Sequence, residues 1–221
     1  ANLIVSLVAI FKGHYQQLRS LDGRRVDYIN SFFEDQVDSG EPSSLVESEK
    51  RIFKGPFFLG DGFLLSHDEG ELLISKNNKL SELIWPVING QEINNHPEQR
   101  PGRKVINFVD WPLEKAQIYK EAFDRIELLV KPIRANDNRA LYREKWWLYG
   151  ENRPGLRTAL RNLDNCFVVA RTTKHLSFSR KLKSIIFTDA ISVLATDRWD
   201  IYAVVQSSVH EVWARKYSGS L

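Results

Sequence analysis

The residues best suited to chemistry in this 221-residue chain are the cations of its second half. From Lys131 to Lys183 there are 13 Lys and Arg against four Asp and Glu, so this basic block carries +9 while the whole chain carries +3. Lysine and arginine neutralise phosphates and release counterions, while arginine and asparagine can form paired hydrogen bonds with guanine and adenine. The block is typical of a polyanion-binding surface. The alternative is a set of solvated helix faces that happen to be basic.

Two polar runs in the basic block, residues 134–145 and 171–180, supply the candidate DNA contacts. The candidates are Arg134, Asn136, Asn138, Arg139, Arg143, Lys145, Arg171, Thr173, Lys174, His175, Ser177 and Arg180. If the second run is extended, alternate residues from Arg171 to Ser179 share one face, which would suit the edge of a major groove. The same pattern also fits a charged, solvated sheet edge.

No self-sufficient catalytic or metal site is visible in the sequence. Residues Phe58–Gly62 fit the F-x-G-x-G pattern of S-adenosylmethionine sites, in which glycines let the backbone approach the cofactor. Residues 63–66 are typical of a strand rather than of the helix that such a site needs, so we expect a turn there. Serine-nucleophile elbows, phosphate-binding loops and paired zinc histidines are absent from the sequence, and the carboxylates are scattered. We therefore expect no catalytic, cofactor-binding or metal-binding residue in this chain.

Cysteine usage and hydropathy indicate the compartment. The single cysteine, Cys166, cannot form an internal disulfide, which is typical of a reducing compartment. No apolar run approaches the roughly 20 residues that a membrane helix needs, so we expect a cytoplasmic protein without a membrane partner. The chain contains no methionine, and we expect it to be a fragment of a longer protein.

Hydrophobic periodicity predicts an α+β fold with short, mostly antiparallel strands and segregated helices. We expect strands at residues 3–11, 104–109, 166–170, 184–188, 191–195 and 201–205. We expect helices at residues 24–37, 80–85, 110–127, 154–163 and 208–217, the last opened by a capping box at Ser208. Turns are expected at residues 21–23 and 89–90. At least one of the adjacent Trp146 and Trp147 should lie in the core.

Several short motifs follow one another along residues 50–217. They are Gly62-Phe63, Val87–Gly90, Asn107-Phe108, Val130–Arg134, Trp146–Tyr149, Arg153-Pro154, Lys174-His175 and Ser207–Trp213. This ordered set resembles the target recognition domain of MmeI-like type II (IIG and IIL) restriction–modification enzymes and the related adenine-specific DNA methyltransferases.

The resemblance implies a sequence-specific reader of double-stranded DNA at residues 51–221. Residues 38–50 are polar and contain Gly and Pro, which predicts a linker. By the same resemblance, residues 1–37 would be the end of a methyltransferase domain, which is the expected partner in the same polypeptide. That parent protein would methylate adenine N6 with S-adenosylmethionine after flipping the base, using catalytic motifs upstream of this chain. In this family, base-reading residues lie in polar strands and loops that correspond to residues 136–145 and 171–180, with Lys174 and His175 the best matched.

Two other functions fit the same residues. Because the rest of the chain is acidic overall, the basic block could face an acidic protein in an interaction or structural domain without DNA specificity. Alternatively, Phe58–Gly62 could serve a stand-alone methyltransferase. Salt-sensitive binding of duplex DNA would favour the DNA-recognition domain. Binding of S-adenosylmethionine by this chain would favour the stand-alone methyltransferase.

Overall fold

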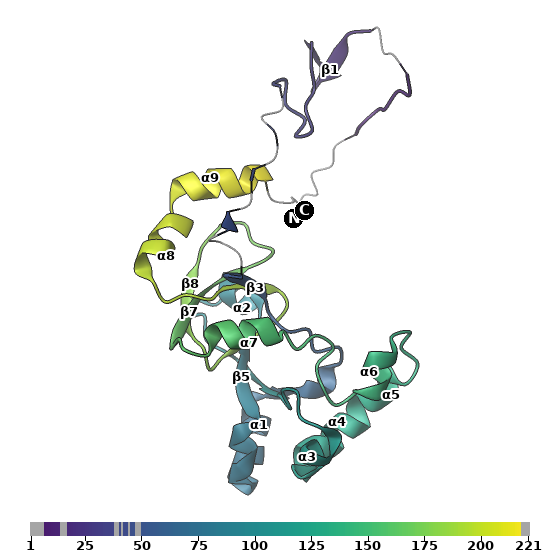
Figure 1. Cartoon of the computed structure of the whole chain (residues 1–221), viewed down its shortest axis with the longest axis vertical. Helices are drawn as coiled ribbons and strands as arrows, with labels where there is room; N and C mark the ends of the chain where they lie inside the picture. Colours follow the sequence, from purple (N-terminus) through teal and green to yellow (C-terminus); the bar gives the residue numbers. More distant parts are fainter. Residues whose placement is uncertain are drawn as a thin grey trace. The chain divides into compact units, whose positions relative to one another are not determined.

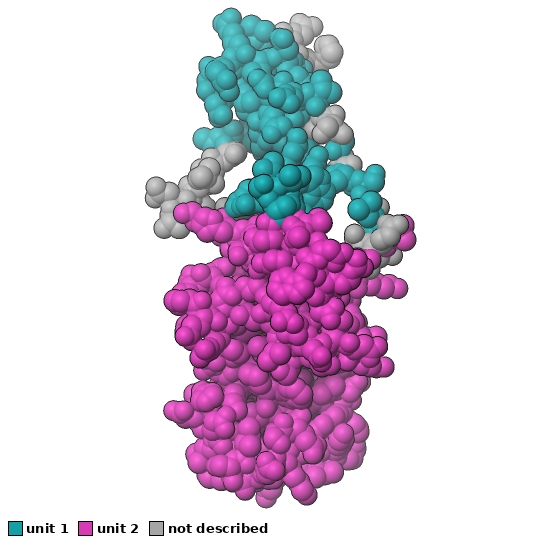
Figure 2. Space-filling view, turned by 90° about the vertical axis from the view of Figure 1, so that its left-hand side faces the viewer, with its two compact units in different colours: residues 1–45, 207–221 teal, residues 46–206 magenta. Residues whose placement is uncertain are grey.

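The computed structural model describes residues 7–13, 17–37, 40, 42–43, 45–46 and 50–217 (Figure 1). The chain forms two compact units, which Figure 2 distinguishes by colour. Unit 1 combines Ala1–Leu45 with Ser207–Leu221, and unit 2 is the continuous segment Val46–Gln206. Helices and mainly antiparallel sheets occur together, so the predicted α+β class is confirmed. None of the helices in the described ranges is long and apolar enough to cross a membrane.

Unit 2 contains two four-stranded sheets. In sheet 1 the strand order is β3 (Ile52–Lys54), β10 (Ile191–Leu194), β7 (Asn165–Ala170) and β8 (Ser179–Leu182), and every neighbouring pair is antiparallel. In sheet 2 the order is β4 (Leu64–Ser66), β6 (Arg103–Ile106), β5 (Ile84–Ile88) and β9 (Ile186–Phe187). Only β5 and β9 run parallel, so the strands are mostly antiparallel, as the sequence predicts.

Sheet 1 is covered on both faces. Successive side chains of β7 point to opposite faces and enter two different cores. Cys166, Val168 and Ala170 face a core with α2 (Gly90–Asn95) and α7 (Pro154–Leu160). Phe167 and Val169 face α8 (Trp199–Val205) in a second core. A strand buried on both faces reads as a continuous apolar run, which explains the sequence of β7.

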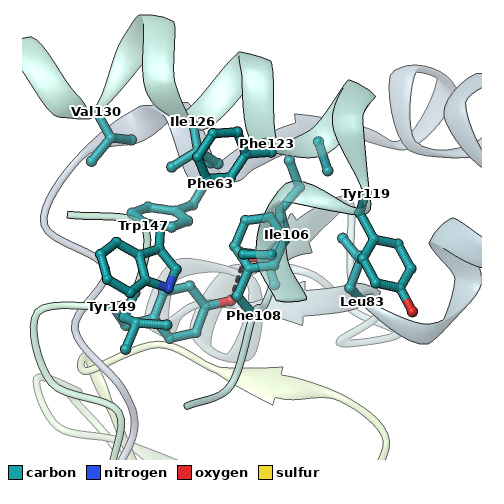
Figure 3. Packing of buried hydrophobic residues seen from close by; sticks show 14 of the residues in the cluster. Phe63, Leu83, Ile106, Phe108, Tyr119, Phe123, Ile126, Val130, Trp147 and Tyr149 are labelled. Carbon is teal, nitrogen blue, oxygen red and sulfur yellow. Dashed lines mark hydrogen bonds between the residues drawn. The ribbon is translucent and has the colours of Figure 1, made fainter. Parts of the chain in front are cut away.

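Sheet 2 supports the largest core of unit 2. Its strands pack against α1 (His67–Lys76), the 3₁₀ helices η2 (Asp61–Phe63) and η3 (Asn78–Glu82), α3 (Leu113–Gln117) and α4 (Lys120–Leu129). Figure 3 shows Phe63, Phe123, Trp147 and Tyr149 within this cluster, where the Phe63 and Tyr149 rings lie 5.1 Å apart. The Tyr149 hydroxyl donates to the carbonyl of Ile106 at 2.9 Å, so this buried polar group is satisfied. Trp146 and Trp147 are both buried, which confirms their predicted place in the core.

The two sheets are joined by a three-residue connection between β9 and β10. Thr188, the first residue of that connection, donates its backbone N–H to the carbonyl of Ile88 in β5 at 3.1 Å. Gly55, after β3, lies against the same connection, where a Cβ atom would come within 2.2 Å of the Thr188 carbonyl oxygen. Only glycine fits so close a backbone contact.

Unit 1 contains a hairpin of β1 (Arg19–Leu21) and β2 (Arg24–Val26), turned by Asp22 and Gly23 as predicted. Residues 28–37 are not helical, so the predicted helix at 24–37 is wrong. The Asn30 side chain accepts from the backbone N–H of both Phe32 and Glu34 at 2.9 Å, which favours a turn over a helix. Helix α9 (Ser208–Tyr217) also belongs to this unit, where the Tyr217 ring packs on Phe32 at 5.6 Å.

Other differences from the predicted elements have local causes. Residues 7–11 are exposed and form no strand, while residues 3–6 lie outside the described residues. Pro86 lies within β5 rather than ending a helix. Asn89 does not make a hairpin turn, because it begins α2 through a capping box with Glu92. Helix α9 is capped one residue earlier than predicted, since the Ser207 hydroxyl accepts from the N–H of His210 at 3.2 Å.

Candidate nucleic-acid interface

The second polar run forms a loop, residues 171–178, between β7 and β8. The extended conformation that would place alternate residues of this run on one face is therefore not formed at residues 171–178. The Thr173 hydroxyl causes the turn, because it donates to the His175 carbonyl at 2.8 Å and accepts from the His175 N–H at 3.3 Å. A side chain that hydrogen-bonds the backbone two residues ahead favours a turn over a strand.

Neighbouring elements hold both ends of this loop. Near its start, the Asn94 side chain of α2 donates to the carbonyl of Thr172 at 2.9 Å. Near its end, the Gln206 side-chain oxygen accepts from the N–H of Phe178 at 2.7 Å, and the Phe178 ring is buried against α8. The loop is thus fixed in place, while the side chains of Arg171, before the first anchor, and of Lys174, His175 and Ser177, between the anchors, stay exposed.

Three cations border the loop. Arg171 and Arg180 are exposed, and among the described residues neither forms an ion pair with a carboxylate. The Arg180 guanidinium lies 5.6 Å from the centre of the Trp199 ring, which favours one orientation of this long side chain. Lys181 donates to the carbonyl of Gln99 at 2.8 Å, and burial lowers the pKa of its ammonium group.

Arg134, the first candidate of the other run, is not available to DNA. Its side chain is only 1% exposed, and its guanidinium donates to the carbonyls of Leu148 at 2.6 Å, Leu59 at 2.9 Å and Phe58. Burial lowers the pKa of Arg134 to about 10, so the group still carries its charge at neutral pH. The prediction of Arg134 as a DNA contact is wrong, because the side chain joins three backbone segments of the core.

The remaining candidates of the first run are exposed on α6 (Ala140–Glu144) and its connection to α5 (Lys131–Arg134). They are Asn136, Asn138, Arg139, Arg143 and Lys145. Arg143 donates to the carbonyl of Asp137 at 2.5 Å, which closes the connection against the helix. Figure 1 shows α6 and β8 well apart, so the two runs form separate polar surfaces rather than one.

The rest of the basic block lies elsewhere. Arg153, Arg157, Arg161 and Lys183 surround a cavity beside α7. Three of them form ion pairs: Arg157 with Asp110 at 3.1 Å, Lys183 with Asp164 at 3.7 Å, and Arg153 with Glu151. The structure therefore divides the block into three groups, where the sequence predicted a single basic surface.

Asn94, Gln99 and Gln206 were not predicted, although they position the loop and the start of β8. The Gln99 side-chain oxygen accepts from the Ser179 hydroxyl at 2.6 Å. No local signal marks these contacts, since the residues that these amides hold in the loop and in β8 lie at least 28 positions away in the sequence. The spacing of Arg153, Arg157 and Arg161 could have been found, because every fourth residue lies near one side of a helix.

The Phe58–Gly62 segment forms a turn, as predicted. Leu59 and Gly60 have positive φ angles of 54° and 133°, and η2 follows. Gly62 packs against Leu129, where an added Cβ would lie 2.7 Å from the Leu129 Cβ. Within the described ranges, no three His, Cys, Asp or Glu side chains are grouped to hold a metal ion.

Comparison with known proteins shows where this fold occurs. No family model and no curated protein matches the sequence. Among solved structures, the chain is similar to the type IIL restriction-modification enzyme MmeI in complex with DNA, with a TM-score of 0.68 and 15% identity over 89% of this chain. The match covers 26% of the MmeI chain, so this chain spans about a quarter of that enzyme's length. The fold is thus related to part of a restriction-modification enzyme.

Proposed function

We propose that this chain is the DNA-recognition part of a restriction–modification or adenine-N6 DNA methyltransferase protein. The observation that carries the proposal is the loop 171–178, a polar loop fixed at both ends and bordered by the exposed Arg171 and Arg180. Functional residues placed on a loop of a rigid sheet are a common arrangement in binding proteins. The fold similarity to MmeI, which was solved with DNA, supports the same function.

The loop geometry suggests different roles for its candidates. Arg171 and Lys174 are exposed and suited to phosphate contacts, and Arg180, held against Trp199, presents a planar fork that suits guanine O6 and N7. Thr173 shapes the turn, because its hydroxyl is engaged by His175. Since the loop is already ordered, binding would cost little additional conformational entropy.

The proposal extends to the parent protein. A methyltransferase domain in the same polypeptide would supply S-adenosylmethionine chemistry at adenine N6, and the base would leave the duplex to reach it. The family resemblance and the related fold support this extension, as does the buried, unpaired Cys166 for a cytoplasmic location.

A titration of duplex DNA against salt tests the DNA proposal. Affinity should fall steeply as salt rises, with a slope that reports several phosphate contacts. If the side chains read bases, Arg180→Ala in the loop surface and Arg143→Ala in the α6 surface should each weaken binding by about 1–3 kcal/mol. Arg24→Ala, an exposed residue of β2 in unit 1, is the matched control and should change little.

The two arginine variants also separate the surfaces. If only Arg180→Ala weakens duplex binding, the DNA contact lies at the loop 171–178. If only Arg143→Ala weakens it, the contact lies at α6. Absence of binding at about 50 mM salt, or equal losses in all three variants, would contradict the proposal. Capture of an acidic protein without nucleic acid would then favour the protein-interaction alternative.

A further inference from the structure

A cavity of about 420 Å³ lies in unit 2 beside α7, away from the loop. Its walls are largely apolar and include Trp85, Leu156, Ile186 and Phe187. The volume falls within the range of about 300–1,000 Å³ that is usual for small-molecule sites, and such sites combine apolar walls with a few placed polar groups.

Two asparagine side chains supply polar groups of opposite kinds. The Asn107 side-chain oxygen accepts from the N–H of Val109 at 2.9 Å, and the Asn152 side-chain nitrogen donates to the Val109 carbonyl at 2.5 Å. These bonds fix the orientation of both amides, which is otherwise ambiguous for asparagine. They leave the Asn107 NH₂ as a donor and the Asn152 carbonyl as an acceptor, neither with a partner among the described residues.

Asn107 is held among buried residues while its NH₂ remains open to the cavity. The residue is only 9% exposed and lines the cavity together with Asn152. Its NH₂ is not sealed in the core, since in the described ranges Thr188 Oγ1 is the only buried side-chain polar atom that lacks a partner, so this donor is open to a ligand in the cavity. Val109 itself has a φ of 58°, which is strained for a β-branched residue, and backbone strain of this kind is concentrated at ligand sites.

The charged groups that line the cavity are all cations. Arg153, Arg157 and Arg161 follow one another at every fourth position, and Lys183 donates to the Arg161 carbonyl at 3.2 Å, which places its ammonium beside them. No carboxylate lines the cavity, although Asp110 pairs with Arg157 at 3.1 Å. The exposed Arg161 guanidinium has no partner in the described part of the chain, so it is available to an anion.

We propose that this cavity binds a nucleotide. A nucleobase is flat and apolar on its faces, and its edge carries a hydrogen-bond acceptor next to a donor, which would meet the Asn107 donor and the Asn152 acceptor. The phosphate would lie at the mouth, near Arg161 and Lys183. The nucleotide can be free or belong to a DNA strand, since both present the same groups. This site does not depend on the loop 171–178 or on its proposed role.

Calorimetry of the whole chain with the four deoxynucleoside 5′-monophosphates, and with the matching nucleosides, tests the proposal. Saturable binding of at least one nucleotide is expected. Arg161→Ala should weaken that binding about tenfold and leave nucleoside binding unchanged, because a charge-assisted hydrogen bond to the phosphate is lost. Arg51→Ala, an exposed arginine outside the cavity, is the matched control and should bind as the unaltered chain does.

A second pair of variants keeps the test independent of charge. Ser184 is exposed and lines the cavity, so Ser184→Phe should block the mouth without entering the core and abolish binding. Thr158→Phe is the control, since Thr158 is exposed on α7 but does not line the cavity. No saturable binding at millimolar nucleotide, or binding that Ser184→Phe leaves intact, would overturn the proposal.

Competition distinguishes the two sources of the nucleotide. If a single-stranded DNA trinucleotide displaces the bound monophosphate, and Ser184→Phe removes this displacement, the site accepts a nucleotide within a strand. If the trinucleotide does not compete, the site takes free nucleotides. If the chain failed to bind duplex DNA at any salt concentration, the calorimetry and the competition results would still stand. The nucleotide proposal and the DNA-recognition proposal can therefore fail separately.

Discussion

Replacement of Arg134 by methionine should destabilise unit 2 while leaving its exposed polar surfaces intact. Methionine keeps the apolar stem of the side chain but is shorter, and it removes the five N–H donors of the guanidinium. The carbonyls of Leu59 and Leu148 would then lose their partner, whereas the Phe58 carbonyl keeps a hydrogen bond from the N–H of Gly150 at 3.4 Å.

The expected cost follows from those two carbonyls. Each buried acceptor left without a partner costs about 1–3 kcal/mol. Removal of a buried charge offsets part of this, because the charge had been taken out of water. We therefore expect Arg134→Met to lower the free energy of unfolding by about 2–4 kcal/mol. The free energy of unfolding of Arg134→Lys should lie between those of the unaltered chain and Arg134→Met, since a compact ammonium cannot reproduce the planar fork of the guanidinium.

Urea unfolding followed by the fluorescence of the buried Trp146 and Trp147 measures the effect. Arg143→Met, on the exposed part of the same run, is the matched control and should change stability by no more than about 0.5 kcal/mol. DNA affinity is measured on folded protein. If Arg134→Met left stability within about 0.5 kcal/mol of the unaltered chain but weakened DNA binding, our assignment of Arg134 to the core would be wrong.

Two further predictions concern Gly55 and Cys166. Gly55→Ala should destabilise unit 2 by about 3 kcal/mol in the same urea assay, because the added Cβ would lie 2.2 Å from the Thr188 carbonyl oxygen. Gly90→Ala is the control and should be nearly neutral, because its Cβ would lie 3.4 Å from the Ala190 carbonyl oxygen. Similar costs for the two variants would contradict the close approach at Gly55. Burial raises the pKa of the Cys166 thiol to about 12, so its contribution to stability is full below its unfolded pKa of about 8.5 and is lost as pH rises toward 12. Relative to Cys166→Ala, the free energy of unfolding should fall by about 1.4 kcal/mol per pH unit above about pH 9, and parallel pH profiles would refute this.

Periodicity predicted the elements whose burial is decided locally. Trp146 and Trp147 lie in the core, and α7 begins at Pro154 and buries Leu156, as their spacing indicates. Residues 201–205 misled the prediction, because the β-branched run suits a strand as well as a buried helix. The helix forms there because Tyr202 packs against Phe167 of sheet 1 at 4.7 Å, and that contact is invisible in the sequence.

The sequence predicted which residue types the candidate site contains, but not how these residues are arranged in space. Exposed cations such as Arg171 and Arg180 were identified from charge alone, since charged side chains usually stay in solvent. Arg134 had the same composition signal and is buried, because long-range backbone carbonyls satisfy its guanidinium. Sequence charge therefore identified residue types correctly but could not distinguish an exposed contact from a core hydrogen-bond donor.

The neighbouring positions of β3 and β10 give unit 2 a modular character. The chain enters sheet 1 along β3 and makes its last strand beside it, where the N–H of Ala195 donates to the carbonyl of Arg51 at 2.8 Å. The first and last strands of unit 2 therefore lie side by side, and α8 follows β10 before the unit ends at Gln206. A graft of this unit would therefore need its boundaries before β3 and after α8, where the chain enters and leaves residues 46–206.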